Sequence, residues 1–263
     1  MKNIAFYGCG NISQAIIDGL INSGFNSKNI FFLDRNIKNQ NKLRKYKIRN
    51  LKNNMNTKID LFILAVKPKD AIQAYKQILK DFKNPKVVSL VAGIKSKKYT
   101  SLDSNIEFLR AMPNTSSRFN LGITALLNAT FKKTNFSKVA TLFKKIGSVI
   151  SLDKESQMDI FTGTVGSGPA YFFYLLKSYE KKLMKICNDD KKIVNEIIVN
   201  LVKGVGVSFE NNSDLDNLIS AVNSKKGTTE AGLKSFKSDK LNSYFEKGIN
   251  SAIKRSKEIS NEY

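Results

Sequence analysis

The sequence predicts an α/β protein in which a doubly wound, mostly parallel sheet is followed by an all-helical C-terminal domain. Short apolar, β-branched runs alternate with amphipathic stretches over the first half of the chain, as they do in βαβ units. A glycine-containing turn follows the first of these runs. From Lys154 onward the pattern changes to longer helical segments. We therefore expect two domains, residues 1–153 and residues 154–263.

Each expected element has its own signal in the first half. Apolar runs of strand length occupy residues 3–7, 30–34, 61–66, 87–91, 106–112, 123–127 and 148–152. Apolar residues at helical spacing predict helices over 12–21, 70–82 and about 135–146. Pro68, just before the second of these helices, suits a helix start.

The second half contains only helical patterns. The expected helices are residues 157–187, 191–210, 215–223, 228–236 and 241–260. Apolar residues lie on more than one face of the segment 161–184. A domain of about 110 residues with so much apolar helix surface is hard to stabilise alone. We therefore expect this half to pack on a partner chain.

Composition excludes several classes of function. Of 263 residues, 41% are apolar and 25% are charged, which is typical of a globular protein. The absence of histidine excludes Ser-His and Cys-His catalysis and histidine metal sites. Cys9 and Cys187 are too few for a disulfide framework or a thiolate metal site. We expect no metal, no membrane span, no secretion signal and a cytoplasmic location.

The charge of the chain is strongly positive. Lys plus Arg number 44 against 22 for Asp plus Glu, giving +22. The lysines are scattered along the chain and only six of the 44 cations are arginines, whereas a nucleic-acid binder more often concentrates arginine and aromatic residues on one element. We expect no nucleic-acid partner, but a diffuse field that attracts anionic small molecules.

The turn after the first expected strand has the pattern of a phosphate site. It reads Gly8-Cys9-Gly10-Asn11-Ile12-Ser13 and leads into a helix. Gly8 permits a tight turn, and Gly10 has no Cβ to block a pyrophosphate at the positive end of the helix. The third position of the fingerprint is Ser13, which is small but not glycine. The placement predicts a Rossmann-type dinucleotide site; a purely structural turn is the alternative.

The second expected strand ends at Asp34-Arg35, about 20 residues further on. An acid at this point binds the adenosine ribose hydroxyls, whereas an arginine meets a 2′-phosphate. Because Arg35 and the surrounding lysines favour the extra charge, we expect NADPH, with NADH possible. The alternative is that Asp34 caps the next helix and Arg35 faces solvent.

Further motifs identify a family. They are Ala65-Val66-Lys67-Pro68 and Arg110-Ala111-Met112-Pro113-Asn114-Thr115, each at the end of an expected strand, then Val165-Gly166-Ser167-Gly168-Pro169-Ala170-Tyr171 and Ser224-Lys225-Lys226-Gly227-Thr228-Thr229. With the phosphate turn, these motifs resemble the pyrroline-5-carboxylate reductase family in order along almost the whole chain. The resemblance implies reduction of 1-pyrroline-5-carboxylate to L-proline by NAD(P)H, the last step of proline biosynthesis. It also implies a Rossmann domain, a helical dimerisation domain and a homodimer or higher homo-oligomer.

The resemblance also assigns residues to roles. The residues expected to hold the cofactor are Gly8, Cys9, Gly10, Asn11, Ile12, Asp34, Arg35, Asn53, Ala65, Val66, Lys67 and Pro68. Those expected beside the nicotinamide are Ala92, Gly93, Met112, Pro113 and Asn114. Those expected at the substrate are Gly168, Pro169, Ser224, Gly227, Thr228 and Thr229. The glycines and Pro169 are expected to bend the long helix and let the substrate approach; a simple break between two helices is the alternative.

Thr229 is the expected catalytic residue. A Gly-Thr-Thr sequence at a helix N-terminus offers N–H and hydroxyl groups to a substrate carboxylate, although ordinary capping would use the same residues. We expect the Thr229 hydroxyl to point at the ring nitrogen as a hydrogen-bonding and relay group, because an alcohol is too weak an acid to act alone. Lys225 and Lys226 replace the proline and first glycine usual in the family, and Ser116 replaces a common proline.

Three other functions remain as alternatives. A β-hydroxyacid dehydrogenase-like enzyme would need a lysine in the glycine-rich helix, where Lys177 is the first lysine after the aromatic run 170–174. A dinucleotide-binding regulator without catalysis would fit the departures at Lys225, Lys226 and Ser116. Nucleic-acid binding would be steeply salt-dependent and independent of cofactor.

Overall fold

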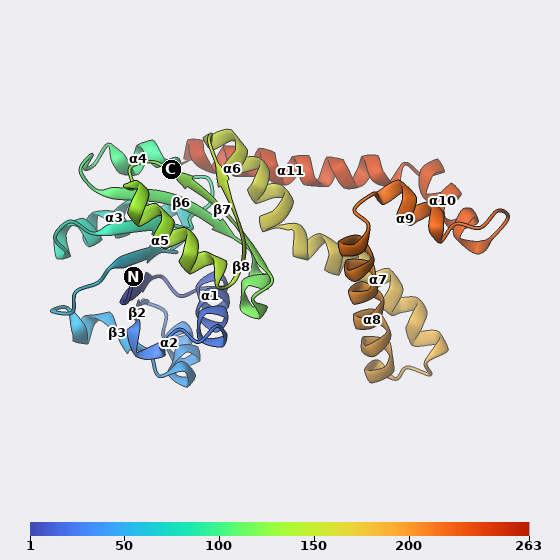
Figure 1. Cartoon of the computed structure of the whole chain (residues 1–263), viewed down its shortest axis with the longest axis horizontal. Coiled ribbons are helices and arrows are strands. Elements are labelled where there is room, and N and C mark those ends of the chain that lie inside the picture. Colours follow the sequence, from blue (N-terminus) through green and yellow to red (C-terminus); the bar gives the residue numbers. More distant parts are fainter. Residues whose placement is uncertain (263) are drawn as a thin grey trace. The chain divides into compact units, whose positions relative to one another are not determined.

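The computed structural model describes residues 1–262, and its first part is built on one mostly parallel sheet (Figure 1). The strand order is β3-β2-β1-β4-β5-β6-β7-β8. The strands are β1 (Ile4–Tyr7), β2 (Ile30–Leu33), β3 (Arg49–Asn50), β4 (Leu61–Leu64), β5 (Lys86–Ser89), β6 (Glu107–Pro113), β7 (Gly122–Asn128) and β8 (Gly147–Leu152). Strand β7 runs antiparallel to β6 and parallel to β8, and the other pairs are parallel.

The order of the strands creates a switch point beside β1. This strand pairs in parallel with β2 on one side and with β4 on the other. The chain therefore winds outward in both directions from β1, and the carboxyl ends of β1 to β6 meet at one edge of the sheet. Open α/β sheets bind ligands in the crevice at this position.

Helices cover both faces of this sheet. They are α1 (Asn11–Asn22), α2 (Ile37–Leu43), α3 (Pro68–Asp81), α4 (Ser96–Thr100) and α5 (Lys133–Lys144). One buried apolar cluster joins α1 and α5 to the sheet, and a second joins α3 and α4 to its other face. In the second cluster the rings of Tyr99 and Phe108 stack at 4.5 Å, and the ring of Tyr75 meets both edge-on.

The helices of the second half are α6 (Glu155–Phe161), a π-helical segment η5 (Thr162–Gly166), α7 (Gly168–Ile186), α8 (Lys191–Asn211), α9 (Leu215–Ala221), α10 (Thr228–Ser238) and α11 (Leu241–Glu262). The helix expected over 157–187 is therefore not continuous: the π-helical segment and the bend at Ser167 interrupt it, and the bend lies within the Gly166–Pro169 run where a break was the alternative. Among residues 1–262, no helix is both long and apolar enough to cross a membrane.

The chain divides into two compact units. One comprises Met1–Pro169 with the C-terminal residues from Asn250 onward, and the other comprises Ala170–Ile249. This division by compactness falls later than the expected domain boundary after residue 153. Met158 and Phe161 of α6 share an apolar cluster with Met112 of β6, and Ser256 of α11 donates a hydrogen bond to Asp159 of α6. These contacts explain why the first unit includes α6 and the end of α11.

Apolar side chains remain exposed on the helices of the second unit. Phe172, Phe173 and Tyr174 of α7 are each at least 65% exposed, as is typical of a surface that a second chain covers. The α/β class and the all-helical second half are confirmed. Sequence periodicity missed β3, α2 and α4, which are short elements.

Candidate functional site

A cavity of about 520 Å³ opens at the switch point of the sheet. Its walls come from the turn after β1, the tip of β2, the loop after β4 and the first turns of α3. The lining residues are Tyr7, Gly8, Cys9, Gly10, Leu33, Asp34, Arg35, Asn36, Asn39, Ala65, Val66, Lys67, Asp70, Gln73, Ala74 and Gln77. The structure thus brings together eight of the residues expected to hold a cofactor: Gly8, Cys9, Gly10, Asp34, Arg35, Ala65, Val66 and Lys67.

Gly8 fixes the turn between three strands. Its φ is +92°, and a Cβ at this position would lie 2.6 Å from the carbonyl oxygen of Ala65. Its N–H donates a hydrogen bond of 2.8 Å to the carbonyl of Leu33, at the end of β2. Only glycine meets both requirements, because a larger residue would be strained by this φ and would collide with the backbone after β4.

Gly10 is different, because it faces open space. It is the N-cap of α1 in an extended conformation, and a Cβ added there would meet no atom of residues 1–262 within 4 Å. The first N–H groups of α1 have no acceptor within the helix. These groups and the positive end of the helix could hold the diphosphate of a dinucleotide in that space.

Asp34 is engaged by backbone and side-chain donors. Its Oδ2 accepts hydrogen bonds from the N–H of Cys9 at 2.6 Å and from Nδ2 of Asn39 at 3.0 Å, and its Oδ1 accepts one of 2.6 Å from the N–H of Asn36. Three of about four acceptor positions of this carboxylate are therefore used by the protein. The alternative in which Asp34 caps the next helix is wrong, since Asn36 is the N-cap of α2 and accepts the N–H of Lys38.

The thiol of Cys9 lies at the floor of the turn and is fully buried. Burial raises the pKa of Cys9 far above that of a free thiol, and the nearby carboxylate of Asp34 raises it further. The side chain is therefore a neutral thiol that fills space below the turn.

Arg35 stands at the rim of the cavity with its side chain 83% exposed. Its Nη2 lies 3.3 Å from Oδ1 of Asp70 in the first turn of α3. An exposed pair of this kind is weak, so the guanidinium can meet a phosphate at little cost. The adjacent polar residues Asn36 and Asn39 line the same rim.

The residues expected beside a nicotinamide lie in the loop after β5 and at the carboxyl end of β6, at the same edge of the sheet. Ala92 and Met112 pack with Val165 of the π-helical segment in one apolar cluster. Nδ2 of Asn114 donates to the carbonyl of Val165 at 3.5 Å, and its Oδ1 accepts the N–H of Ile123 at 3.2 Å. Pro113 is the last residue of β6.

Gly93 belongs to the same edge and has a φ of +77°. A Cβ there would lie 2.5 Å from Cγ2 of Ile259, in the last turns of α11. The C-terminal helix therefore packs directly on this loop. Neither Gly93 nor the residues expected beside the nicotinamide line the 520 Å³ cavity.

The remaining expected cofactor residues lie outside the cavity lining. Asn11 and Ile12 form the first turn of α1, and Pro68 is the first residue of α3. Asn53 is exposed in a short 3₁₀ helix, η3 (Leu51–Asn54).

The expected substrate residues divide between the two units. Gly168 and Pro169, at the start of α7, belong to the first. Ser224, Gly227, Thr228 and Thr229 belong to the second unit. Gly227 is the N-cap of α10, Thr228 and Thr229 are its first residues, and the carbonyl of Ser224 accepts the N–H of Gly227 at 3.0 Å.

Lys226, in the same turn, has a φ of +57°, the left-handed conformation that glycine adopts most easily. Its N–H donates a hydrogen bond of 2.6 Å to the carboxylate of Glu230 in the first turn of α10. The turn before α10 therefore places a lysine in a backbone conformation suited to the glycine that the family usually has here.

Sequence reasoning missed part of the cavity lining. Asp70, Gln73 and Gln77 form a polar stripe on α3 at spacings of three and four residues, and that periodicity was the available signal. Asn36 could have been found as a helix cap, because it precedes a helical run. Asn39, on the following helix turn, has no comparable signal.

Comparisons with known proteins show the family of the chain. Residues 155–259 match the family model described as pyrroline-5-carboxylate reductase dimerisation, and residues 3–93 match NADP oxidoreductase coenzyme F420-dependent. A relative from Haemophilus influenzae, named pyrroline-5-carboxylate reductase, is 30% identical over 98% of this chain and 97% of its own length. The chain belongs to the pyrroline-5-carboxylate reductase family. The resemblance found in the sequence motifs is thereby confirmed.

Solved structures of the reductase family have the same fold. A pyrroline-5-carboxylate reductase from Coxiella burnetii has a TM-score of 0.83 and 26% identity, with 98% of both chains covered. The pyrroline carboxylate reductase of Plasmodium falciparum, solved with NADP bound, has a TM-score of 0.86 with 98% of both chains covered; at 22% identity this likeness concerns the fold alone.

Proposed function

We propose that this chain reduces the cyclic imine 1-pyrroline-5-carboxylate to L-proline, with NADPH as the hydride donor. The observation that carries the proposal is the cavity at the switch point, formed by the phosphate turn, the tip of β2 and the loop after β4. This cavity belongs to a chain that matches reductases of this name over nearly its full length.

The cavity supports a dinucleotide with a 2′-phosphate. Gly10 leaves open space at the start of α1, where a diphosphate can approach the backbone N–H groups. The carboxylate of Asp34 already accepts hydrogen bonds from the N–H groups of Cys9 and Asn36, so it has less acceptor capacity left for the ribose hydroxyls. Arg35 is exposed on the rim, where a 2′-phosphate would receive its charge.

A reduced nicotinamide, when bound, supplies the hydride. The chain's part in this step is to hold the ring and exclude water, which the apolar residues Ala92, Met112 and Pro113 can do. Asn114 contributes polar atoms at the same edge, and its contact with Val165 fixes its amide. Gly168 and Pro169 begin α7 just beyond the π-helical segment, and we assign them to the approach path of the substrate.

The substrate carboxylate is assigned to the start of α10. The N–H groups of Thr228 and Thr229 belong to the first turn, where the helix supplies no acceptor, and Ser224 and Gly227 complete the turn. The Thr229 hydroxyl donates to, or relays a proton toward, the ring nitrogen. A protonated cyclic imine is already electrophilic, so orientation suffices and no imidazole is needed.

Self-association and a cytoplasmic location belong to the same proposal. The exposed aromatic run Phe172, Phe173 and Tyr174 and the match to a dimerisation model support a homodimer or higher homo-oligomer.

The test is an absorbance assay of NADPH oxidation by the purified chain with pyrroline-5-carboxylate, with L-proline measured as product. Thr229→Ala should lower kcat about 100-fold, since positioned proton-transfer groups contribute about 10² to 10⁴. Thr229→Ser should retain most of the rate, because it keeps the hydroxyl. Thr141→Ala is the matched control, since this threonine lies on α5 and, within residues 1–262, its hydroxyl donates a hydrogen bond only to the carbonyl of Ser137 in the same helix. A normal rate in Thr229→Ala would remove Thr229 from the mechanism.

A further inference from the structure

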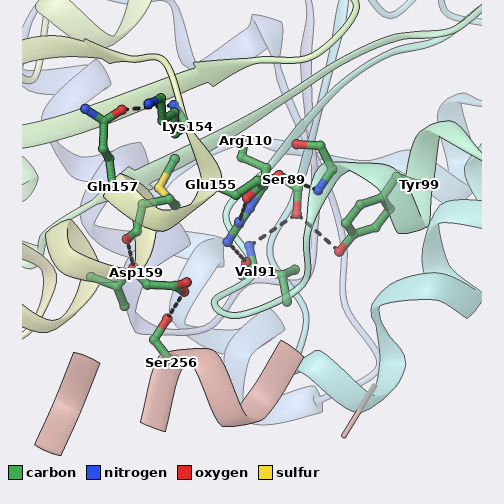
Figure 2. A network of polar contacts seen from close by, with 12 residues as sticks. Ser89, Val91, Tyr99, Arg110, Lys154, Glu155, Gln157, Asp159 and Ser256 are labelled. Atoms are coloured by element: carbon green, nitrogen blue, oxygen red, sulfur yellow. Dashed lines mark hydrogen bonds and ion pairs between the residues drawn. The ribbon is translucent and has the colours of Figure 1, made fainter. Parts of the chain in front are cut away.

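An arginine is buried in the centre of the first unit. Arg110, in β6, is 2% exposed and is paired with the carboxylate of Glu155, the first residue of α6 (Figure 2). Its Nη2 lies 3.5 Å from the carbonyl oxygen of Val91, in the loop after β5. Within residues 1–262 its Nε has no hydrogen-bond acceptor. Replacing a buried ion pair by apolar residues is often neutral or stabilising, so packing alone does not account for this charge.

Glu155 extends the connection to a third element. Its Oε1 accepts a hydrogen bond of 2.7 Å from the N–H of Ser96, the first residue of α4. One ion pair therefore joins β6, the loop after β5, the start of α4 and the start of α6. The segment between Val91 and Ser96, which contains Ala92 and Gly93, is held at both ends.

The same loop is held from two other sides. The N–H of Val91 donates to Oγ of Ser89 at 3.3 Å, so both backbone polar groups of Val91 face fixed partners. One helical turn after Glu155, Asp159 accepts a hydrogen bond of 2.7 Å from Ser256 of α11, and both side chains are buried (Figure 2). The last turns of α11 then pack on Gly93.

We propose that Arg110 is a positioning residue for the nicotinamide half of the cofactor. The inference rests on the proposed function, which assigns Ala92 and Gly93, together with Met112 to Asn114, to the nicotinamide. Arg110 is connected to both segments, since it lies two residues before Met112 on β6 and its Nη2 approaches the carbonyl that precedes Ala92. It does not line the cavity at the switch point, so it acts through the backbone that it holds.

If Arg110 positions the nicotinamide half of the cofactor, loss of its contacts should weaken binding of that half and leave binding of the adenosine half unchanged. The phosphate turn, Arg35 and the loop after β4 surround the adenosine side and have no contact with Arg110 among the described hydrogen bonds and ion pairs. Loosening the Val91–Gly93 loop should therefore misplace the nicotinamide while the adenosine half binds normally. A displacement of about 1 Å can lower a rate by as much as about 10²-fold.

The experiment compares Arg110→Lys and Glu155→Gln with the wild type, using calorimetry with NADPH and with adenosine 2′,5′-bisphosphate, which lacks the nicotinamide half. Lysine keeps the charge but cannot reach Glu155 and Val91 together. Glutamine at position 155 keeps an acceptor for Ser96 and removes the charge opposite Arg110. Glu155 is 29% exposed, so Glu155→Gln decides the question if Arg110→Lys fails to fold. Arg118→Lys is the matched control, because Arg118 forms an ion pair with Asp18 of α1 and, among the described residues, shares no hydrogen bond or ion pair with Arg110, Glu155 or the Val91–Ser96 segment.

We expect both variants to bind adenosine 2′,5′-bisphosphate within about twofold of the wild type, to bind NADPH about fivefold more weakly, and to lose about tenfold or more in kcat. Arg118→Lys should match the wild type in its affinity for adenosine 2′,5′-bisphosphate, its affinity for NADPH and its kcat. Equal losses for both ligands, or unchanged kcat and NADPH binding, would overturn the positioning role. A wild-type chain that binds NADPH but does not reduce pyrroline-5-carboxylate would refute the proposed function instead, and the comparison of the two ligands would still decide the role of Arg110.

Discussion

The carboxylate of Asp34 accepts a hydrogen bond of 2.6 Å from the backbone N–H of Cys9, so the acid at the tip of β2 anchors the turn after β1. Its other oxygen accepts the N–H of Asn36, at the start of α2. The bonds of Asp34 thus hold in place the two segments that form one wall of the cavity. In dinucleotide-binding folds, an acid at this position more often binds the ribose hydroxyls of the cofactor.

The anchoring role predicts that Asp34→Asn weakens NADPH and NADH binding by similar factors, about five- to tenfold. The reason is that a charge-assisted hydrogen bond to the turn is lost for both cofactors. The Kd of each cofactor, measured by fluorescence titration, is the test. A loss confined to NADH would instead show that Asp34 binds the ribose hydroxyls.

Arg35→Gln should lower NADPH affinity about tenfold and leave NADH affinity within about twofold of the wild type, because only NADPH has a 2′-phosphate. The ratio of kcat/KM for the two cofactors measures this effect. Arg44→Gln is the control, since Arg44 lies in a 3₁₀ helix (Arg44–Tyr46) and does not line the cavity. Equal losses for NADPH and NADH would remove Arg35 as the phosphate ligand.

The two glycines of the turn should respond differently to alanine. Gly8→Ala forces a Cβ to within 2.6 Å of the carbonyl of Ala65 at a φ of +92°, and should lower the free energy of unfolding by about 3 kcal/mol or prevent folding. Gly10→Ala should keep the wild-type Tm, because its Cβ enters open space, but weaken NADPH binding about tenfold or more. Thermal unfolding and a binding titration on both variants suffice. Normal cofactor binding by Gly10→Ala would show that no phosphate lies there.

Much of this fold could be predicted from local pattern. The strand and helix around Gly8 and Gly10 have strong short-range signals, and no observed bound differs from the expected one by more than one residue. The two-residue strand β3 and the short helix α4 offer too few residues for periodicity to be detected. A break at the Gly166–Pro169 run was one of two interpretations of the sequence, but the π-helical segment Thr162–Gly166 just before it was missed, because its apolar spacing differs by at most about one residue from that of the helix around it.

The sequence could predict which residues belong to the site, but not which partners their side chains bind. That Asp34 and Arg35 follow β2 is a matter of sequence position. That Asp34 is bonded to Cys9 while Arg35 remains exposed depends on the close approach of two strand ends, which no local pattern encodes. The pairing of Arg110 with Glu155 joins residues 45 positions apart and had no signal in a single sequence.

The thiol of Cys9 should be unreactive in the folded chain. Burial, and then the carboxylate of Asp34, raise its pKa, so it stays protonated well into the alkaline range. Because the folded pKa is the higher one, its contribution to stability is complete below the unfolded value of about 8.5 and declines as pH rises above it. A Cys187→Ser variant isolates Cys9, and a thiol reagent at pH 8 should label it only after denaturation. Rapid labelling of the native variant would contradict the buried, protonated state.

Lys226→Gly should raise the free energy of unfolding by up to about 1 kcal/mol, because glycine relieves the left-handed conformation at φ +57°. The same change should raise the KM for pyrroline-5-carboxylate, since it removes a positive charge beside the turn assigned to the substrate carboxylate. Lys225→Gly is the control, because the left-handed conformation is found at Lys226 and not at its neighbour. A destabilised Lys226→Gly with unchanged KM would contradict both effects.

The reaction itself can be followed with NADPH deuterated at both C4 positions of the nicotinamide. Incubated with the purified chain and pyrroline-5-carboxylate, it should yield L-proline that carries one deuterium at C5, detected by mass spectrometry, in amounts equal to the cofactor oxidised. Unlabelled proline, or no proline while the deuterated cofactor remains intact, would show that this chain does not transfer hydride to the imine.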